Sequence, residues 1–359
     1  MRGRRIDRSP DRPGRAAGGE ARTRRAGGNQ GRSLTLALPA GASPDRRVRI
    51  YEVGPRDGLQ NEAGLIATVD KLHFIRLLGA AGLTDIEATS FVRPASIPQL
   101  ADADELVRGL DQGTGLRYPV LVPNQRGMAR AEAAGALALA VFTAASDAFT
   151  QHNIGMTIDE SLAAFKPVLE RAADLGWWRR AYVSTAFGCP YAGRIEPAAA
   201  IQVGLRLAEL GAEEICFGDT IGVAVPDQVE ELTGLAIAAG LAPGRIAFHF
   251  HDTRGTALAN VAAGLRAGIR TFDSSTGGTG GCPYAPGAAG NLATEDLVYF
   301  LDASGWVSGV RLDGVLEAAR FIAGALNRPL ASKVGQAGGR DPVSGAATVG
   351  PTGPASARP

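Results

Sequence analysis

The feature that most constrains the fold of this chain is an eightfold alternation of short β-rich runs with helical runs, between roughly residues 46 and 330. The predicted strands are RVRIYEV (47–53), LTDIEATS (83–90), RYPVLV (117–122), LALAVFTA (137–144), RRAYVST (179–185), EEICFGD (213–219), RIAFHFH (245–251) and IRTFDSS (269–275). Eight strand–helix units of this length predict one α/β domain, a single (β/α)8 TIM barrel. An open doubly wound sheet is the alternative, but no G-x-G-x-x-G follows the first strand and eight units suit closure better.

Helix start and stop signals support the same alternation. Thr157 and Glu160 fit a capping box, and Pro197 and Pro226 stand where first-turn prolines belong. Glycines follow several predicted helices, at Gly82, Gly176, Gly211, Gly240 and Gly268.

Both ends of the chain differ from the middle in composition. Residues 1–32 carry ten Arg against three acidic residues, with many Gly and almost no large apolar residues. Such a segment cannot bury enough surface to offset its ordering entropy. We therefore expect a disordered Arg/Gly-rich arm over 1–45, the barrel over 46–330 and a low-complexity tail over 331–359.

Composition narrows the partners and the compartment. A net charge of +1 and a pI near 7.8 give no support for a nucleic-acid partner, and no apolar run is long enough to cross a membrane. Three scattered cysteines indicate a reducing compartment. We expect a cytoplasmic protein. Mitochondrial import is the alternative, because the arm is Arg-rich and acid-poor, although it has one Ser before residue 30 and no amphipathic pattern.

Two of the four histidines lie in the FHFHD stretch, residues 248–252. Residues i and i+2 of a strand share a face, so His249 and His251 point into the barrel lumen near the C-terminal end of the strand, where barrel enzymes build active sites. The other face carries apolar side chains that meet the helices: Ile246, Phe248 and Phe250. Two satisfied core histidines are the alternative, but a shared cation explains two neighbouring buried imidazoles more economically.

Further candidate ligands end other strands. Asp57 follows the first strand next to Arg56, and Asn291 ends the Gly-rich loop after the eighth strand. With His249 and His251 they would supply two nitrogens and two oxygens. Such a mixed set suits Mg²⁺ or Mn²⁺, with Zn²⁺ as an alternative.

Six motifs together resemble one known family. VGPRDGLQNE, EATSFV, FGCPYAG, GDTIGVA, HFHDT and GGCPYAPGAAGNLATEDLVY follow one another in the order and spacing of the 3-hydroxy-3-methylglutaryl-CoA lyase family, which belongs to the metal-dependent TIM-barrel lyases. The similarity runs from about Val48 to Val334. The first and last motifs are specific to the lyase branch, whereas H-x-H is shared across the wider group.

The resemblance implies a reaction and a role for each matching position. The reaction is cleavage of 3-hydroxy-3-methylglutaryl-CoA to acetyl-CoA and acetoacetate, by default in leucine breakdown and ketone-body formation. The implied metal ligands are Asp57, His249, His251 and Asn291. The implied catalytic residues are Arg56, Asp57, Glu87, Asp219, His249 and Cys282. Within the same motifs, the substrate-binding candidates are Arg56, Gln60, Ser90 and Thr220. The family also implies a homodimer.

The residue types suit a reverse Claisen cleavage. A divalent cation chelated by the substrate's hydroxyl and carboxylate makes the hydroxyl proton easier to lose. Arg56 can hold the thioester oxygen as negative charge grows there, and His249 is the better candidate to move a proton to the enolate carbon. A salt bridge from Arg56 to Asp57 or Glu87 is the structural alternative for the arginine, and Glu87 and Asp219 could be purely structural carboxylates.

Two departures from the family pattern bear on the substrate. Arg254 stands after HDT where an aromatic residue is expected, and Arg93 follows SFV where a small residue is common. An arginine at the mouth could favour an extra carboxylate or the phosphates of CoA, although a solvated surface arginine is the simpler interpretation. The alternatives left open are the same chemistry on a longer branched or citramalyl-type CoA, a 2-isopropylmalate-synthase-like acyltransferase, and a barrel that only binds CoA.

Overall fold

The structure is a computed structural model that describes residues 46–281 and 290–338. The predicted arm (1–45), most of the predicted tail and the candidate Cys282 lie outside the described residues. Within the described ranges no helix is long and apolar enough to cross a membrane.

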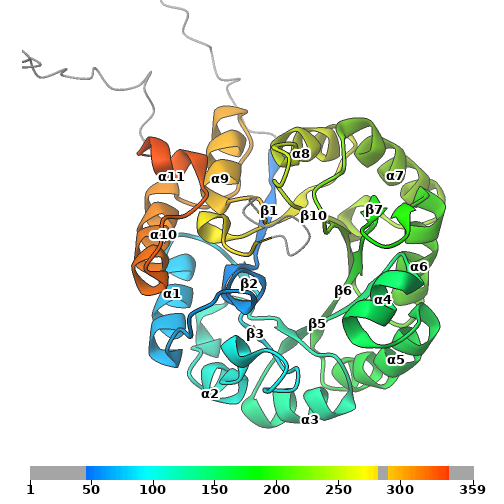
Figure 1. The fold of residues 1–359 in the computed structure, drawn as a ribbon, viewed down its shortest axis with the longest axis horizontal. Coiled ribbons are helices and arrows are strands. Elements are labelled where there is room, and N and C mark those ends of the chain that lie inside the picture. Colours follow the sequence, from blue (N-terminus) through cyan, green and yellow to red (C-terminus); the bar gives the residue numbers. More distant parts are fainter. Residues whose placement is uncertain (1–45, 282–289, 339–359) are drawn as a thin grey trace, which may run out of the picture. The chain divides into compact units, whose positions relative to one another are not determined.

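The predicted barrel is confirmed, with helices around a ring of parallel strands (Figure 1). Nine parallel strands have the order β2-β1-β11-β10-β9-β6-β5-β4-β3. Their bounds are β1 Arg49–Glu52, β2 Asp85–Ile86, β3 Thr89–Ser90, β4 Val120–Leu121, β5 Ala138–Ala144, β6 Trp178–Ser184, β9 Glu214–Asp219, β10 Ile246–Phe250 and β11 Thr271–Ser274. A separate antiparallel hairpin, β7 (Gly188–Cys189) with β8 (Gly193–Arg194), follows β6.

The ring closes through the second predicted strand, 83–90, which is divided into β2 and β3. β2 pairs with β1 and β3 pairs with β4. Between them, the Glu87 N–H donates to the Glu52 carbonyl (2.8 Å) and the Ala88 N–H donates to the Pro119 carbonyl (2.9 Å). The segment 83–90 thus pairs with the strands on both of its sides. Because β2 and β3 together form one stave, the nine strands make a barrel of eight staves.

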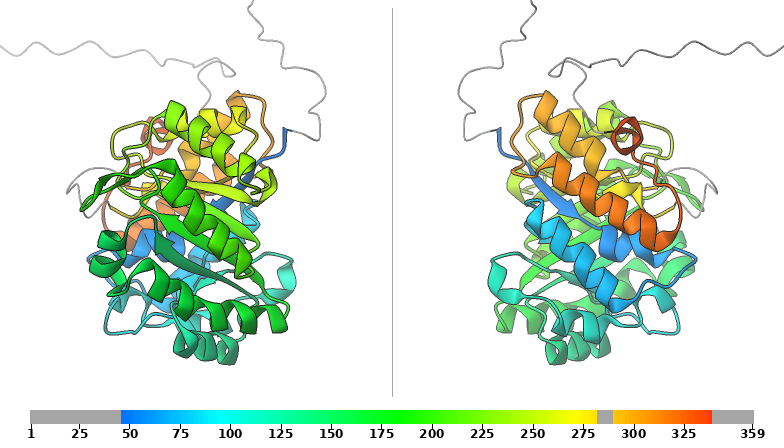
Figure 2. Two further views of the ribbon diagram at one scale, coloured as in Figure 1. Left: turned by 90° about the vertical axis from the view of Figure 1, so that its right-hand side faces the viewer. Right: turned by 90° about the vertical axis from the view of Figure 1, so that its left-hand side faces the viewer.

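Helices cover the outside of the ring, and α1 packs on α10 where the last unit meets the first (Figures 1 and 2). Their bounds are α1 Thr68–Ala80, α2 Ala103–Arg108, α3 Gln125–Ala134, α4 Asp147–Ile154, α5 Ile158–Asp174, α6 Pro197–Glu209, α7 Pro226–Ala238, α8 Ala257–Arg266, α9 Thr294–Ala303, α10 Leu312–Leu326 and α11 Lys333–Ala337. The helix signals are confirmed: Thr157 and Glu160 form the capping box of α5, and Pro197 and Pro226 begin α6 and α7. All five predicted end glycines have positive φ.

The alternation along β10 is as predicted and separates two apolar layers. The outward side chains Ile246, Phe248 and Phe250 join the large core between strands and helices. Ala247 instead belongs to a small cluster inside the ring, with Tyr51 and Tyr182 among its members. His249 of β10, and His251 directly after it, therefore lie on the lumen side, next to this inner cluster.

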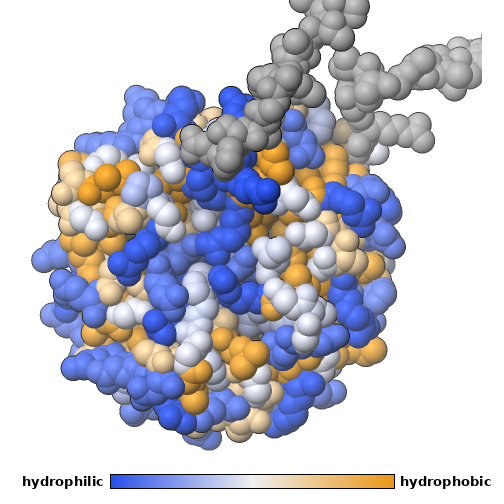
Figure 3. Space-filling view, turned by 180° about the vertical axis from the view of Figure 1, so that it is seen from behind, coloured by the Kyte–Doolittle hydropathy of each residue, from blue (hydrophilic) through white to orange (hydrophobic). Residues whose placement is uncertain are grey.

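Charged side chains fill the lumen next to the inner cluster. Arg180 is fully buried and pairs with Asp273 (Nη2–Oδ1, 2.5 Å) and with Glu214 (Nε–Oε1, 3.0 Å). Glu214 also pairs with Arg49, which in turn pairs with Asp85 (3.4 Å). Seen from behind the view of Figure 1, hydrophilic residues gather in the middle of the surface (Figure 3). We call the network of ion pairs among these side chains the lumen floor; its members are Arg49, Asp85, Arg117, Arg180, Glu214 and Asp273.

The last described residues bind back onto the barrel. Asp296 of α9 accepts hydrogen bonds from Ser332 Oγ (3.0 Å) and from the backbone N–H of Lys333 (3.1 Å) and Val334 (2.8 Å). The predicted domain boundary at 330/331 therefore precedes a short segment, including α11, that packs on α9.

Candidate functional site

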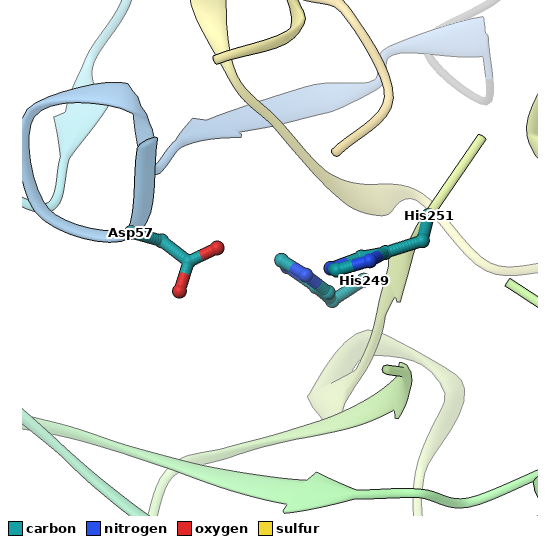
Figure 4. A group of neighbouring side chains, drawn as sticks. All are labelled: Asp57, His249 and His251. Carbon is teal, nitrogen blue, oxygen red and sulfur yellow. The ribbon is translucent and has the colours of Figure 1, made fainter. Parts of the chain in front are cut away.

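Three predicted metal ligands from opposite ends of the sequence converge at the barrel mouth. Asp57 follows β1, and His249 and His251 come from the end of β10 (Figure 4). One ligand atom from each lies within 4.8 Å of those of the other two. Figure 4 shows the Asp57 carboxylate turned towards the two imidazoles. This spacing fits ligands around a single cation.

Asn291, the fourth predicted ligand, reaches the same place. Its Nδ2 donates to Asp57 Oδ2 (2.9 Å) and to the Thr279 carbonyl (3.0 Å). Its Oδ1 and the Nδ1 of His251 are buried and have no hydrogen-bond partner within the described part of the chain. Buried polar atoms are normally paired, so an orphaned amide oxygen and imidazole nitrogen beside a carboxylate fit a divalent cation.

A tight turn after β1 aims Arg56 and Asp57 into the lumen. Residues Gly54–Gly58 form one turn of π-helix, in which the N–H groups of Asp57 and Gly58 both donate to the Val53 carbonyl. Gly54 is required here because a Cβ would lie 2.5 Å from Glu52 Oε1. Glu52 itself is buried and accepts the Gly54 N–H (2.8 Å), which fixes the start of the turn.

The Arg56 guanidinium is held on two sides. Its Nε donates to Glu87 Oε1 (2.6 Å) and its Nη1 donates to Asp57 Oδ1 (2.6 Å). Glu87 is fully buried, and its second oxygen accepts from the Tyr182 hydroxyl. The salt bridges foreseen as an alternative for Arg56 are therefore present. They do not remove it from the cavity, because Arg56 still lines the cavity wall.

The electrostatics leave two of the ligands, Asp57 and His251, in metal-binding protonation states. Burial works to raise the pKa of Asp57, but Arg56 and the two imidazoles lower it, and the resulting pKa is about 2. Burial, reinforced by the charge of His249, lowers the pKa of His251 to about 3. Near neutral pH Asp57 is thus a carboxylate and His251 a neutral imidazole, the forms that bind cations.

A cavity of about 620 Å³ opens over the cluster. Its wall includes the predicted residues Arg56, Asp57, Gln60, Thr220, His249 and His251. Gln60 Nε2 also donates to Asp57 Oδ1 (2.9 Å). Arg93, one of the two residues that depart from the family pattern, lies on the same wall. The other, Arg254, donates to the carbonyls of Ile221 and Gly222 and so connects two loops.

Two predicted residues are turned away from this wall. Both oxygens of Asp219 accept backbone N–H groups of its own loop, from Val223 (2.8 Å) and Ala224 (3.1 Å). Burial raises the pKa of Asp219 to about 6 in spite of these bonds. Ser90 is fully buried and donates to the Leu121 carbonyl (3.4 Å). Both side chains therefore bond to backbone groups behind the cavity wall and support it from there.

Residues that the sequence analysis did not single out complete the site. Asp273 Oδ2 lies 3.3 Å from His249 Nδ1, and Tyr182 connects Glu87 with Arg180. A signal for them existed, because Arg180 and Asp273 are charges inside predicted buried strands, and a buried charge requires a partner.

Comparison with known proteins agrees with this geometry. The fold and the cluster define a (β/α)8-barrel enzyme with a candidate divalent-metal site. The HMGL-like family model matches residues 47–322. The chain belongs to this family.

Individual relatives are similar over most of their length. The mitochondrial hydroxymethylglutaryl-CoA lyase of Bos taurus is 49% identical over 292 residues, which cover 81% of this chain and 90% of that protein. The crystal structure of the HMG-CoA lyase of Bacillus subtilis superposes with a TM-score of 0.80 at 46% identity, covering 82% of this chain and 99% of the other. A structure of an HMG-CoA lyase from Acinetobacter baumannii in complex with coenzyme A and 3-methylmalate has a TM-score of 0.79 at 35% identity, covering 83% and 97%.

Proposed function

We propose that this protein is a carbon–carbon lyase that cleaves 3-hydroxy-3-methylglutaryl-CoA to acetyl-CoA and acetoacetate. The observation that carries the proposal is the convergence of Asp57, His249 and His251 within 4.8 Å beside the buried guanidinium of Arg56. Family membership and the identity to hydroxymethylglutaryl-CoA lyases support the same reaction.

The proposed ligands of a divalent cation are Asp57, His249, His251 and Asn291, and Mg²⁺ or Mn²⁺ suits their mixed oxygen and nitrogen set. When bound, the cation would polarise the substrate's tertiary hydroxyl and orient its carboxylate. The chain's part is to hold the ligands apart at fixed positions. The hydrogen bonds from Asn291 and Gln60 to Asp57 do this for the carboxylate.

Arg56 is the proposed partner of the thioester oxygen, where negative charge grows as the carbon–carbon bond breaks. A guanidinium already fixed by Glu87 and Asp57 needs no reorganisation at that moment, which is the main advantage of a preorganised charge. Glu87 and Tyr182 act here through Arg56, whereas Gln60 and Thr220 stand on the cavity wall and are proposed to contact substrate.

Proton transfer completes the proposed reaction. His249 reaches the cavity and is the proposed carrier of the proton that the enolate carbon gains. Cys282 is proposed to assist from the loop after β11, which follows the pattern GGCPYA of the family. Asp219 is proposed to brace the loop after β9, and Ser90 to brace β3 against β4.

A second candidate substrate is an acyl-CoA with an additional or displaced carboxylate, such as a citramalyl-type CoA. The observation that favours it is Arg93, a guanidinium on the cavity wall at a position where the family commonly has a small residue. Arg93→Ser would separate the two, because it should leave cleavage of 3-hydroxy-3-methylglutaryl-CoA within a few fold and abolish any preference for the more acidic substrate.

The test is direct. Purified protein freed of metal with EDTA is incubated with 3-hydroxy-3-methylglutaryl-CoA, with and without added MgCl₂ or MnCl₂, and acetoacetate is measured. The expected result is acetoacetate formed only with added metal. If the protein cleaves citramalyl-CoA but not 3-hydroxy-3-methylglutaryl-CoA, the second candidate substrate replaces the first. Absence of both would refute lyase activity.

Assembly and compartment are also proposals. We propose a homodimer, as the family resemblance implies, and light scattering coupled to size exclusion would measure it. We propose the cytoplasm as the compartment. The mitochondrial name of the bovine relative makes import of the Arg-rich N-terminal residues the competing hypothesis, which a fluorescent fusion in the native cell would decide.

A further inference from the structure

The two histidines of the site have different surroundings. His249 Nδ1 lies 3.3 Å from Asp273 Oδ2, whereas His251 Nδ1 has no hydrogen-bond partner within the described ranges. Asp273 stands on β11 beside β10, and the register pairs it directly with His249. Among the described residues, a carboxylate therefore supports the Nδ1 of His249 but not the Nδ1 of His251.

Asp273 is itself immobile and charged. Its side chain is fully buried, and Arg180 donates to both of its oxygens, from Nη2 to Oδ1 (2.5 Å) and from Nη1 to Oδ2 (3.3 Å). Arg180 has only donors, so both oxygens of Asp273 act as acceptors towards it. Asp273 thus faces His249 as a carboxylate, which can only accept a hydrogen bond.

Arg180 in turn is fixed by stacking. Its guanidinium carbon lies 3.7 Å from the ring centroid of Tyr51 and 4.8 Å from that of Tyr182, and its Nη1 donates to the Tyr182 hydroxyl (3.1 Å). Arg180 is a planar cation held between two rings and two carboxylates, Asp273 and Glu214. The orientation of Asp273 is therefore set by the lumen floor rather than by the cavity.

We propose that Asp273 is a positioning residue that fixes His249 in the Nδ1–H tautomer and so presents the lone pair of Nε2 to the cavity, with Arg180 as the anchor that orients Asp273. A neutral imidazole carries its proton on one nitrogen, and a carboxylate acceptor at Nδ1 places the proton there. Carboxylates that accept from a metal-binding histidine raise its basicity and fix its ring, and their loss typically weakens metal binding 10- to 100-fold. The inference rests on the proposed function only in that His249 is a metal ligand.

The first test is to determine the tautomer of His249 in the wild-type protein, which needs neither substrate nor metal. The chain has four histidines, so nitrogen-15 NMR of histidine-labelled, metal-free protein resolves each ring, and His249→Gln assigns the signals of His249 by their loss. The expected result at pH 8 is a protonated Nδ1 and an unprotonated Nε2. A proton on Nε2 would overturn the proposal.

Asp273→Asn gives the second test. Arg180 has only donors, so the new amide oxygen turns to Arg180 and the amide N–H turns to His249 Nδ1, which moves the ring proton to Nε2. The expected result is Mn²⁺ binding weakened about 10- to 100-fold in a titration followed by electron spin resonance. Wild-type Mn²⁺ affinity in a folded Asp273→Asn protein would refute the positioning role. If this variant does not fold, the wild-type tautomer decides alone.

Tyr182→Phe is the matched control. It removes the hydrogen bond from Arg180 to the Tyr182 hydroxyl, which leads through Glu87 to Arg56, and leaves the Asp273–His249 contact in place. Turnover should fall while Mn²⁺ affinity stays at the wild-type value, and an equal loss of affinity would show that any damage to the lumen floor weakens metal binding. Because tautomer and Mn²⁺ affinity are measured without substrate, failure of the proposed lyase activity leaves both results interpretable.

Discussion

Glu87→Gln tests whether Arg56 owes its catalytic position to a buried counter-charge. Glu87 is fully buried, accepts from Arg56 Nε at 2.6 Å and accepts from the Tyr182 hydroxyl. Glutamine has the same shape but one acceptor and no charge. Its amide N–H group must face either Arg56, which has only donors, or the Tyr182 hydroxyl, which must then turn its own proton away.

The expected losses of stability and turnover in Glu87→Gln follow from these contacts. Replacing charge-assisted hydrogen bonds by neutral ones costs about 1–1.5 kcal/mol each, so the two contacts of Glu87 give a loss of about 2–3 kcal/mol in the free energy of unfolding. For a domain of this size the melting temperature should fall by roughly 5–10 °C. A guanidinium displaced by as little as about 1 Å should lower kcat about 100-fold, with little change in KM, because the contact matters most as charge develops.

The assay measures acetoacetate formation at saturating metal, with Mn²⁺ affinity and melting temperature recorded on the same samples. Glu132→Gln is the control, because Glu132 pairs with Arg171 on the surface, where an ion pair contributes at most about 1 kcal/mol. It should change none of the three quantities appreciably. Wild-type kcat in Glu87→Gln, together with a lowered melting temperature, would show that Glu87 is structural and does not position Arg56.

Three further outcomes are expected. His251→Ala should weaken Mn²⁺ binding by about 100-fold or more while the metal-free protein melts normally, and unchanged affinity would remove His251 from the ligand set. Burial raises the pKa of Glu295 from 4.5 to about 8, so the folded protein holds a proton that the unfolded chain has lost. The free energy of unfolding should therefore fall by roughly 3–4 kcal/mol as pH rises from 5 to 8, and the melting temperature with it. Glu295→Gln should flatten that dependence in a calorimetric series. Gly277→Ala should lower stability by about 1–3 kcal/mol in denaturant titrations, because φ is +74° and a Cβ would lie 2.1 Å from Leu330; wild-type stability would mean that the turn can shift at no cost.

Sequence reasoning predicted the parts of the site that depend on local periodicity. The alternation of β10 placed His249 and His251 on one face, and the rule that barrel sites lie at strand C-termini brought Asp57 to the same mouth. Both inferences need only the pleat of a strand and the direction of parallel staves. Asn291 was reached by the same rule, applied to the loop after β11.

The contacts behind these residues could not be predicted in the same way. Asp273 and Arg180 are 93 residues apart and meet only because β6 and β11 face each other across a closed ring. Strand parity could have placed each charge in the lumen, but it could not select the partner. Likewise, the division of the segment 83–90 into β2 and β3 depends on the hydrogen bonds that Glu87 and Ala88 make with two different staves.

The positive and negative charges of the lumen floor are not balanced within either half of the barrel. Arg49, Asp85 and Arg117 from the first three staves carry one more positive than negative charge, with Arg117 also paired to Asp85 (2.9 Å). Within the later staves, Arg180, Glu214 and Asp273 carry one more negative than positive charge. Each half thus neutralises most of its own charge and leaves a remainder that the other half neutralises, through the contact between Arg49 and Glu214. The closed ring is therefore electrically complementary across its two halves, and a fragment containing only one of them would keep a charge without its partner.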